Sequence, residues 1–346
     1  MRRLLLLLLC LLLPAAALAD QTLTFTFVGD CTLGSEEYRQ NAEDALNAYV
    51  DRCGYDYFFQ NVQFLMQHDD LTIINLESVL SDNAYGENKN KTYRFRGPTH
   101  FTEILTRSGI ELCTLANNHT ADYGSIGLNA THQALDAAGV GWCADEDIFL
   151  FEKDGVKVAF IAMVSSSFFN NREWYKQKVK SLKEEDGVNA VILCFHGGSE
   201  YNTVHNKYQE NYARIATDAG TDLVIMHHPH VLQGITVMNN RYVCYSLGNF
   251  VFGGNCKVRA LETMAVQAAL TFDDDGVLQG SQLCLYPMHV SDDPVDNHYQ
   301  PCLVTSEEAE QVLKLVRADS TLTIPAFNEA TGRVTMDYLP AFAPAE

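Results

Sequence analysis

The feature that most constrains the fold is a series of short apolar runs, each followed at once by a polar residue. Such runs occupy residues 23–28, 71–76, 110–116, 188–195 and 223–226. Their length and their content of Val, Ile, Leu and Phe are typical of buried strands. Segments with helical periodicity separate most of them. Strands that alternate with helices predict an α/β fold.

Helices are predicted between and after these strands. Glycines follow three of the helices at the position of a C-cap: Gly109, Gly139 and Gly220. The predicted helices span 36–50, 57–67, 99–108, 125–138, 175–185, 206–219 and 307–317.

Turn sequences mark hairpins in the second half of the chain. Asn239-Asn240 and Asp274-Asp275-Gly276 each separate two strand-like runs, so the later strands are expected to pair antiparallel or in a mixed arrangement. The architecture that fits is a mixed sheet, or two stacked sheets, covered by helices. These later strands are predicted at 241–245, 265–272 and 283–288, and a further strand is predicted before them at 156–164.

Polar residues follow five of the strands directly. In open α/β sheets, ligands bind at the edge where the carboxyl ends of the strands meet. Imidazole, carboxylate and amide donors together suit one or two divalent ions, with Mn, Zn or Fe the best fit. Such ions acidify a bound water and polarise a phosphoryl or carbonyl oxygen. The predicted site contains Asp30, Glu77, Asn118, His119, His196, His228 and His230.

Five of these seven residues also have a purely structural interpretation. Asp30 could cap a following helix. Asn118 could occupy a turn, and Glu77 could be a solvated strand end. His228 and His230 could be surface residues of a loop. Their joint occurrence at strand ends favours an assembled hydrolytic site, in which His119 is the candidate general acid.

The net charge of the chain limits the classes of molecule that it can bind. With 44 acidic and 24 basic residues, the formal net charge is −20. Such a surface repels nucleic acid and anionic membranes, so nucleic acid is excluded as a partner. An anionic substrate would need local help from a metal or an arginine. Arg94 and Arg96 are candidates to bind its phosphate or carboxylate, and pairing with local acids is the alternative.

Residues 1–19 have the pattern of a secretory signal peptide. Arg2 and Arg3 precede an apolar run at 4–13, Pro14 ends that run, and Ala17-Leu18-Ala19 suits a signal peptidase. An uncleaved membrane anchor is the alternative. Both interpretations place the rest of the chain outside the cytoplasm.

The cysteines include no CxxC spacing of the kind that binds zinc. Cys113, Cys194 and Cys244 lie within apolar runs and are expected as small buried residues. Other cysteines could form disulfides whose connectivity the sequence leaves open, namely Cys53, Cys143, Cys256, Cys284 and Cys302.

Short motifs around the site residues are the most specific signal in the chain. They are Val28-Gly29-Asp30 with Leu33-Gly34, Asn75-Leu76-Glu77, Leu115-Ala116-Asn117-Asn118-His119 with Asp122-Tyr123-Gly124, His196 with Glu200-Tyr201, His228-Pro229-His230-Val231 with Gln233, and Tyr245-Ser246-Leu247-Gly248-Asn249-Phe250. In order and rough spacing this set resembles the CapA-type family of bacterial poly-γ-glutamate capsule synthesis proteins, relatives of the calcineurin-like metallophosphoesterases. The resemblance runs from about Thr24 to Phe252, with a weaker tail to about residue 300.

The resemblance implies a four-layer αββα sandwich with mixed sheets over residues 20–300, followed by a C-terminal helix and loose tail over 301–346. Asp30 and His119 would be the catalytic residues. Glu200 and Tyr201 would orient His196 or contact substrate, and Asn249 would also lie at the substrate. The implied metal ligands are Asp30, Glu77, Asn118, His196, His228 and His230.

Three positions depart from the family pattern. Thr32 stands where the phosphoesterases have a histidine two residues after the first aspartate. Its presence implies a one-metal site or a different second ligand. Glu77 replaces the bridging aspartate, and Gly197 stands where CapA-like chains often have tryptophan, which implies a more open pocket wall.

The function implied is that of an extracytoplasmic protein that makes, attaches or processes poly-γ-glutamate or another cell-surface polymer by metal-dependent hydrolysis. Its substrate would be the polymer or an anionic small molecule, and membrane-bound capsule synthase subunits would be its partners. Two alternatives remain. One is a non-catalytic polymer-binding or scaffold subunit of a capsule synthase, which Thr32 favours. The other is a secreted phosphoesterase unrelated to capsule.

Overall fold

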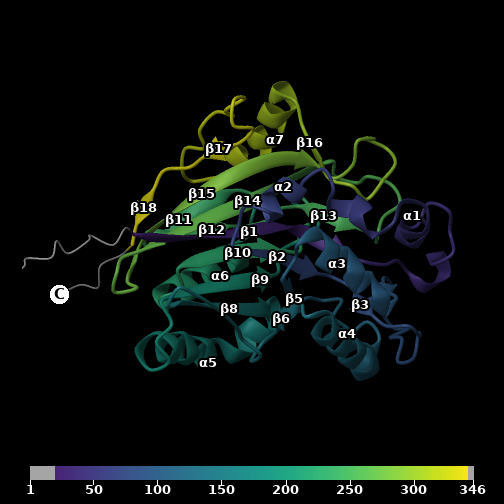
Figure 1. Ribbon diagram of the computed structural model, residues 1–346, viewed down its shortest axis with the longest axis horizontal. Helices are drawn as coiled ribbons and strands as arrows, with labels where there is room; N and C mark the ends of the chain where they lie inside the picture. Colours follow the sequence, from purple (N-terminus) through teal and green to yellow (C-terminus); the bar gives the residue numbers. More distant parts are fainter. Residues whose placement is uncertain (1–19, 342–346) are drawn as a thin grey trace, which may run out of the picture.

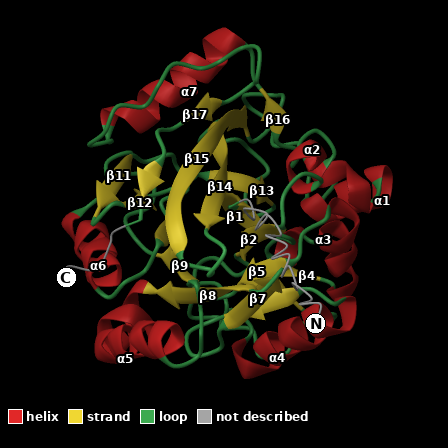
Figure 2. Ribbon diagram, turned by 60° about the vertical axis from the view of Figure 1, so that its left-hand side comes forward, coloured by secondary structure: helices red, strands yellow, loops and turns green. Residues whose placement is uncertain are grey.

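The computed structural model describes residues 20–341, and the predicted signal peptide at 1–19 lies outside this range. Within it, no helix is long and apolar enough to cross a membrane. Two β-sheets face each other at the centre of the molecule, and helices lie outside them (Figure 1). Figure 2 shows the strands in the interior and the helices around them.

The first sheet is built around the long strand β1 (Gln21–Thr32). β1 pairs parallel with β2 (Leu71–Leu76) on one side and antiparallel with β14 (Glu262–Phe272) on the other. A short strand, β13 (Asn249–Phe252), pairs parallel with the end of β1. The sheet is completed by β5 (Leu112–Thr114), β6 (Gly141–Cys143), β15 (Leu278–His289), β16 (Cys302–Leu303), β17 (Val334–Thr335) and β18 (Leu339–Pro340).

The second sheet has a parallel centre and an antiparallel strand at each edge. Its strands follow the order β11-β12-β10-β9-β8-β7. They are β7 (Phe149–Lys153), β8 (Val156–Val164), β9 (Ala190–His196), β10 (Leu223–His227), β11 (Ile235–Met238) and β12 (Arg241–Cys244). A separate pair joins β3 (Val79–Leu80) to β4 (Arg96–Gly97).

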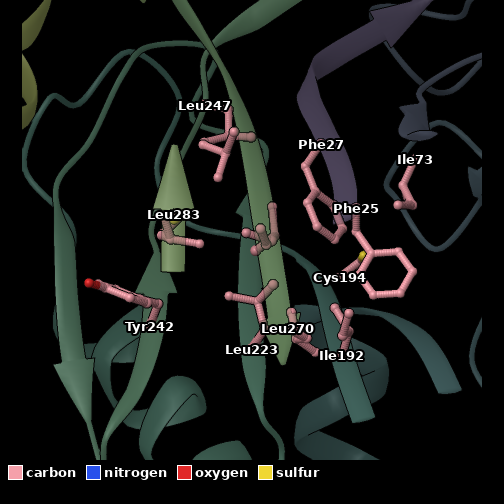
Figure 3. Packing of buried hydrophobic residues seen from close by; sticks show 14 of the residues in the cluster. Phe25, Phe27, Ile73, Ile192, Cys194, Leu223, Tyr242, Leu247, Leu270 and Leu283 are labelled. Carbon is pink, nitrogen blue, oxygen red and sulfur yellow. The ribbon is translucent and has the colours of Figure 1, made fainter. Parts of the chain in front are cut away.

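The central apolar core lies between the two sheets. Phe25 and Ile73 of the first sheet point toward Ile192, Cys194 and Leu223 of the second (Figure 3), and all five side chains are buried. Alternate residues of the same strands face outward into two further clusters, one on each outer side of the sandwich.

Helices cover both outer faces. The first sheet is covered by α1 (Leu46–Cys53), α2 (Gln63–Met66), α3 (Thr102–Ser108) and α4 (Gly124–Ala138). The second is covered by α5 (Ser165–Glu184) and α6 (Lys207–Asp218). The four-layer αββα arrangement predicted from the sequence is therefore confirmed.

The C-terminal part of the chain belongs to the same core. Val312, Leu313 and Val316 of α7 (Ser306–Ala318) are buried in the cluster between the sheets. β17 and β18 pair with β15, so the segment expected as a loose tail is tied to the sandwich as far as residue 341.

Both predicted hairpins are confirmed. Asn239 and Asn240 have φ values of 51° and 55°, as the tight turn between β11 and β12 requires. Asp273 accepts backbone hydrogen bonds from Asp275 and Val277 in the turn between β14 and β15.

Several element boundaries differ from the prediction. The helix expected at 36–50 is a single 3-10 turn at Glu37–Arg39 followed by α1, which ends at Gly54 with φ of 82°. The helix expected at 57–67 is a 3-10 turn and the four residues of α2. Conversely, α5 begins ten residues before the expected 175, because Phe168 packs its ring on Phe195 of β9 and extends the buried face.

Every cysteine of the described range has a free thiol, so none of the open disulfide pairings forms there. Cys113, Cys194 and Cys244 are buried as predicted. Burial raises the pKa of each of these three thiols, which leaves them protonated and unreactive at neutral pH.

Candidate metal centre

The predicted site residues meet where the two sheets touch at one edge. Asp30 of β1 lies beside Asn75 of β2 in the first sheet, and His196 of β9 lies beside His227 of β10 in the second. The backbone N–H of His228 donates to Asp30 Oδ2 at 3.2 Å, which joins the two sheets. β1 continues to Thr32, so Asp30 lies within its strand and does not cap a helix.

Glu77 is the centre of the cluster. Its carboxylate is fully buried, and within residues 20–341 neither oxygen has a hydrogen-bond partner. Nε2 of His196 lies 3.5 Å from Oε1, and Nε2 of His119 and His230 each lie 3.9 Å from it. Burial raises the pKa of Glu77 well above its usual value. This position rules out a solvated strand end.

Asp30 is held from four sides. Its Oδ1 accepts a hydrogen bond from Asn75 Nδ2 at 2.8 Å and faces His227 Nδ1 at 3.2 Å. Its Oδ2 accepts the His228 N–H and faces His230 Nδ1 at 3.2 Å. Burial alone would raise the pKa of Asp30, but the nearby imidazoles of His227 and His230 outweigh it and hold that pKa well below its usual range.

The surroundings lower the pKa of two histidines of the cluster and raise the pKa of a third. Burial, together with the neighbouring imidazoles, lowers the pKa of His196 and His228, so both rings are neutral as metal ligation requires. Burial also opposes a charge on His230, but Glu77 and Asp30 raise the pKa of that ring to about 10. His230 therefore places a positive charge between Asp30 and Glu77 when no ion is bound.

His119 is oriented by Asp122. His119 Nδ1 lies 2.7 Å from Asp122 Oδ2, so Nε2 points toward Glu77. Asp122 is fully buried, accepts the backbone N–H of Phe95 at 2.8 Å and forms an ion pair with Lys91. The sequence analysis quoted Asp122 only as part of a motif and gave it no role. Its spacing of three residues from His119 was the available signal.

The donor atoms are close enough to hold divalent ions. Three overlapping groups each place their ligand atoms within 4.8 Å of one another. The unpartnered oxygens of Glu77 supply donors that only a cation or a proton would satisfy, and mixed imidazole and carboxylate donors suit a divalent transition metal. The residues therefore fit one or two divalent ions. The groups are Glu77–His196–His228, Glu200–His228–His230 and Asp30–Glu77–His230.

Asn118 lies within the cluster, with its Oδ1 2.6 Å from His196 Nε2. Thr32, by contrast, donates its hydroxyl to the backbone oxygen of Glu77 at 3.2 Å and fixes the end of β2. The histidine beside Asp30 comes instead from β10, as His227, which the sequence analysis did not include. His227 comes close to Asp30 only because the two sheets pack against each other, and the sequence does not show how they pack.

Arg94 and Arg96 do not reach the cluster. Arg94 donates to Glu87 at 2.9 Å. Arg96 donates to both carboxylate oxygens of Glu37 and to the Ser81 backbone oxygen. Pairing with local acids, the alternative to substrate binding, is the arrangement found. Neither arginine lines the cleft above the histidines.

Three other candidates lie around His230. Asn249 is buried behind it, with Oδ1 2.9 Å from His230 Nδ1, so it orients the ring and does not reach outward. Glu200 and Tyr201 line the cleft with His230, and Glu200 belongs to a ligand group with His228 and His230. Glu200 thus lies beside those two rings, and its expected role of orienting His196 stays a prediction.

Gly197 does not open the pocket wall as expected. A Cβ at this position would lie 2.8 Å from the Phe195 ring and 2.9 Å from the Ser165 side chain. Those two side chains already fill the space, so a larger residue at this position would have to displace the Phe195 ring or the Ser165 side chain.

Comparison with known proteins assigns the chain to a family. The family described as bacterial capsule synthesis protein PGA_cap matches residues 24–254. The chain belongs to this family. The matched range contains all the site residues described above, from Asp30 to Asn249.

Curated relatives agree with the PGA_cap assignment. The chain is 28% identical over 263 residues to the capsule biosynthesis protein CapA of Bacillus anthracis, covering 69% of this chain and 62% of the relative. It is 28% identical over 255 residues to the PGA biosynthesis protein CapA of Bacillus subtilis, covering 68% and 64%. The matched part thus spans less than two thirds of either relative. The sulfate thiohydrolase SoxB of Thermus thermophilus has a TM-score of 0.43 at 11% identity, over 86% of this chain and 60% of that one.

Proposed function

We propose that this PGA_cap protein hydrolyses a bond in an anionic cell-surface polymer, with a divalent metal ion as cofactor, during the making, attachment or processing of poly-γ-glutamate. The observation that carries the chemistry is the buried, unpartnered carboxylate of Glu77 among three imidazole Nε2 atoms at 3.5 to 3.9 Å. The names of the Bacillus relatives supply the polymer class.

Five side chains would hold the ion or ions, and Asn118 adds an amide oxygen beside His196. A divalent ion at this place activates water and polarises the oxygen of the bond to be cleaved. The site lies at the junction of the two sheets, on rigid strand ends, which keeps the donor atoms in fixed positions. The five are Asp30, Glu77, His196, His228 and His230.

His119 is the proton donor to the leaving group in this proposal. Asp122 accepts the Nδ1 proton, so the second nitrogen of the ring faces the cluster and the cleft. Burial lowers the pKa of His119, and the nearby carboxylate of Asp122 partly offsets that effect. A ring held in one orientation, with a pKa below its usual value, gives up its proton readily once it has received one.

Export and partners belong to the same proposal. The signal-peptide pattern at 1–19 supports an extracytoplasmic location, where a surface polymer is accessible. Membrane-bound subunits of a capsule synthase would deliver or receive that polymer. The net charge of −20 makes attraction between the bulk surface and a polyanion unfavourable, so recognition must be local.

A second function, as a non-catalytic polymer-binding subunit, is favoured by one observation. Thr32 uses its hydroxyl to hold the Glu77 backbone and offers no imidazole to an ion. A chain with this function would bind the polymer at the same cleft and cleave nothing.

Metal analysis and a substrate screen separate these possibilities. Purified protein is analysed for bound divalent ions and tested on poly-γ-glutamate, a phosphodiester and a phosphomonoester. The hydrolase proposal expects a bound ion, cleavage of the polymer, and loss of both in His228→Ala but not in the surface control His68→Ala. An ion-free wild type without hydrolysis contradicts it. Binding of the polymer without cleavage supports the scaffold function, and cleavage of phosphoesters alone supports a phosphoesterase.

A further inference from the structure

The cleft above the metal cluster has an outer rim that the proposed reaction does not use. Its inner wall contains His119 and His230, and its mouth is formed in part by Tyr93, Tyr201 and Arg259. Arg259 lies between β13 and β14 and is the only arginine or lysine that lines the cleft. The sequence analysis did not select it.

The charge of Arg259 is not neutralised. Eight of the eleven arginines in residues 20–341 lie within 4.0 Å of a carboxylate oxygen, as expected in an acidic chain. Arg259 has no such partner in that range. Its Nη1 donates to the Tyr201 hydroxyl at 3.3 Å, and its guanidinium carbon lies 5.6 Å from the centre of the Tyr201 ring. A neutral phenol orients the guanidinium and leaves its charge available.

Tyr201 is itself fixed to the metal cluster. Its backbone N–H donates to the oxygen of Pro229 at 2.7 Å, between His228 and His230. Tyr201, His228 and His230 have φ values of 57°, 100° and 57°, in the region that side chains other than glycine rarely adopt. Such conformations persist where the surroundings impose them, most often at binding sites. The strained loops place the Tyr201 ring 6.0 Å from that of His230.

A structural role does not explain Arg259. Its side chain is exposed, and its described polar contact is with Tyr201 of the same rim. Glu200, exposed on the same cleft, forms no ion pair with it. An exposed arginine held in one orientation beside a reactive site has the form of a receptor for an oxyanion, which a guanidinium binds through two parallel hydrogen bonds.

We infer that Arg259, oriented by Tyr201, is an anion subsite at the mouth of the cleft that binds a carboxylate or phosphate group of the substrate beside the bond to be cleaved. This inference rests on the proposed function for the assignment of the cleft as the substrate site. It explains how a chain of charge −20 engages an anionic polymer. Binding then depends on the positive charge of Arg259 and not on the electrostatic field of the whole protein.

The test is a calorimetric titration of two oligomers into the full protein. Short poly-γ-glutamate presents carboxylates, and inorganic polyphosphate of similar length presents phosphates. Arg259→Gln is compared with Arg333→Gln, which removes the same charge from another arginine without a carboxylate partner, one that lines a different cavity. Arg259→Lys keeps the charge without the paired hydrogen bonds.

The subsite predicts that Arg259→Gln weakens binding of the preferred oligomer about tenfold or more, the effect of losing charged hydrogen bonds. Arg259→Lys should recover part of the affinity, and Arg333→Gln should leave it unchanged. The thermal midpoint of Arg259→Gln should equal that of wild type, because the side chain is exposed. The preferred oligomer identifies the group as carboxylate or phosphate.

Two results would overturn the subsite: equal affinity in Arg259→Gln and Arg333→Gln, or a wild type that binds neither oligomer. The proposed hydrolysis fails separately. A protein that holds no metal or cleaves nothing, yet loses oligomer binding in Arg259→Gln, retains the subsite and loses the reaction.

Discussion

Asp122 Oδ2 lies 2.7 Å from His119 Nδ1, a contact that fixes which nitrogen of the imidazole faces the metal cluster. The carboxylate is buried and belongs to the same turn as the histidine, so its position does not depend on a ligand. It is the closest approach between a carboxylate and a histidine of the cluster.

Removing the charge of Asp122 should therefore impair turnover more than metal binding. Asp122→Asn keeps the size of the side chain and loses the carboxylate that orients His119. We expect kcat to fall about 10- to 100-fold, the usual effect of losing such a partner. Metal content, measured on the same preparation, should remain at the wild-type level. Unchanged kcat with an unchanged pH profile would show that His119 is not the proton donor.

Glu77→Gln should separate stability from function. In metal-free protein the buried Glu77 carboxyl has no hydrogen-bond partner in residues 20–341, an arrangement that costs about 1–3 kcal/mol. The neutral amide should leave the metal-free protein close to wild type in stability in urea denaturation, because it removes both the cost of the buried carboxyl and its attraction to His230. The same variant should gain no stability from added metal. A marked loss of metal-free stability would mean that the carboxylate is paired in solution.

Metal should stabilise the wild type by mass action. An ion present at a hundred times its dissociation constant adds about 2.7 kcal/mol to the free energy of unfolding. We expect the thermal midpoint to rise on titration with Mn²⁺ or Zn²⁺ and to return to its starting value with a chelator. His228→Ala should show no rise, whereas the exposed-site control His68→Ala should behave as wild type.

The stability of metal-free protein should pass through a maximum near pH 6.5. His196 and His228 have pKa values lowered by burial from the ordinary 6.5, so the unfolded chain binds more protons below that pH and stability falls with acid. His230 makes the opposite contribution to the pH dependence of stability. Despite burial, Glu77 and Asp30 raise its pKa to about 10, so its contribution is complete below 6.5 and is lost as the pH rises toward 10.

Urea denaturation in the presence of a chelator, at several pH values on each side of 6.5, measures this profile. A free energy of unfolding that rises steadily through pH 8.5 would contradict the assigned state of His230. Saturating metal should remove most of the loss on the alkaline side, because the ion replaces the proton as the counter-charge.

Arg96 should affect folding and not substrate binding. It donates to both Glu37 oxygens and to the Ser81 backbone, and its side chain is largely buried. Arg96→Gln should lower the free energy of unfolding by about 1.5–3 kcal/mol, as for hydrogen bonds to charged groups. Affinity for the substrate oligomer should match wild type at a temperature where the variant is folded. A selective loss of affinity would restore Arg96 as a substrate ligand.

The sequence identified those parts of the site that depend on local order along the chain. Asp30, Glu77, His196 and His228 each follow or end an apolar run, and parallel strands bring such positions to one edge. His227, one residue before His228, was not selected. Its side chain meets Asp30 only because the second sheet lies across the first in one register.

Arg259 was missed for a related reason. It lies in a loop without a recognisable motif, and its significance is that no carboxylate oxygen of residues 20–341 forms an ion pair with it, although Glu200 lines the same cleft. Arg94 and Arg96 attracted attention as a pair in the sequence, but nearby Glu87 and Glu37 occupy them. Whether an arginine is free to bind a ligand depends on the residues around it in the folded chain. Those neighbours cannot be read from the sequence.

The differences between the predicted and the observed helices near the N-terminal end of the described range have a local cause. Residues 36–50 have a helical pattern of apolar positions, but the chain ahead of α1 has no side chain that caps a helix start. Where a helix was expected at 57–67, a 3-10 turn buries Phe58 and Phe59 and the short α2 buries Leu65 and Met66. Packing on the first sheet overrides the periodicity.

The hydrogen bond from His228 to Asp30 crosses from one sheet to the other. An ion held by Glu77 at the end of the first sheet and by His196 and His228 of the second would therefore link the two halves of the sandwich. Loading and release would be coupled to the spacing of the sheets, and a residue far from the cluster that alters the packing between Phe25 and Ile192 would change metal affinity without touching a ligand.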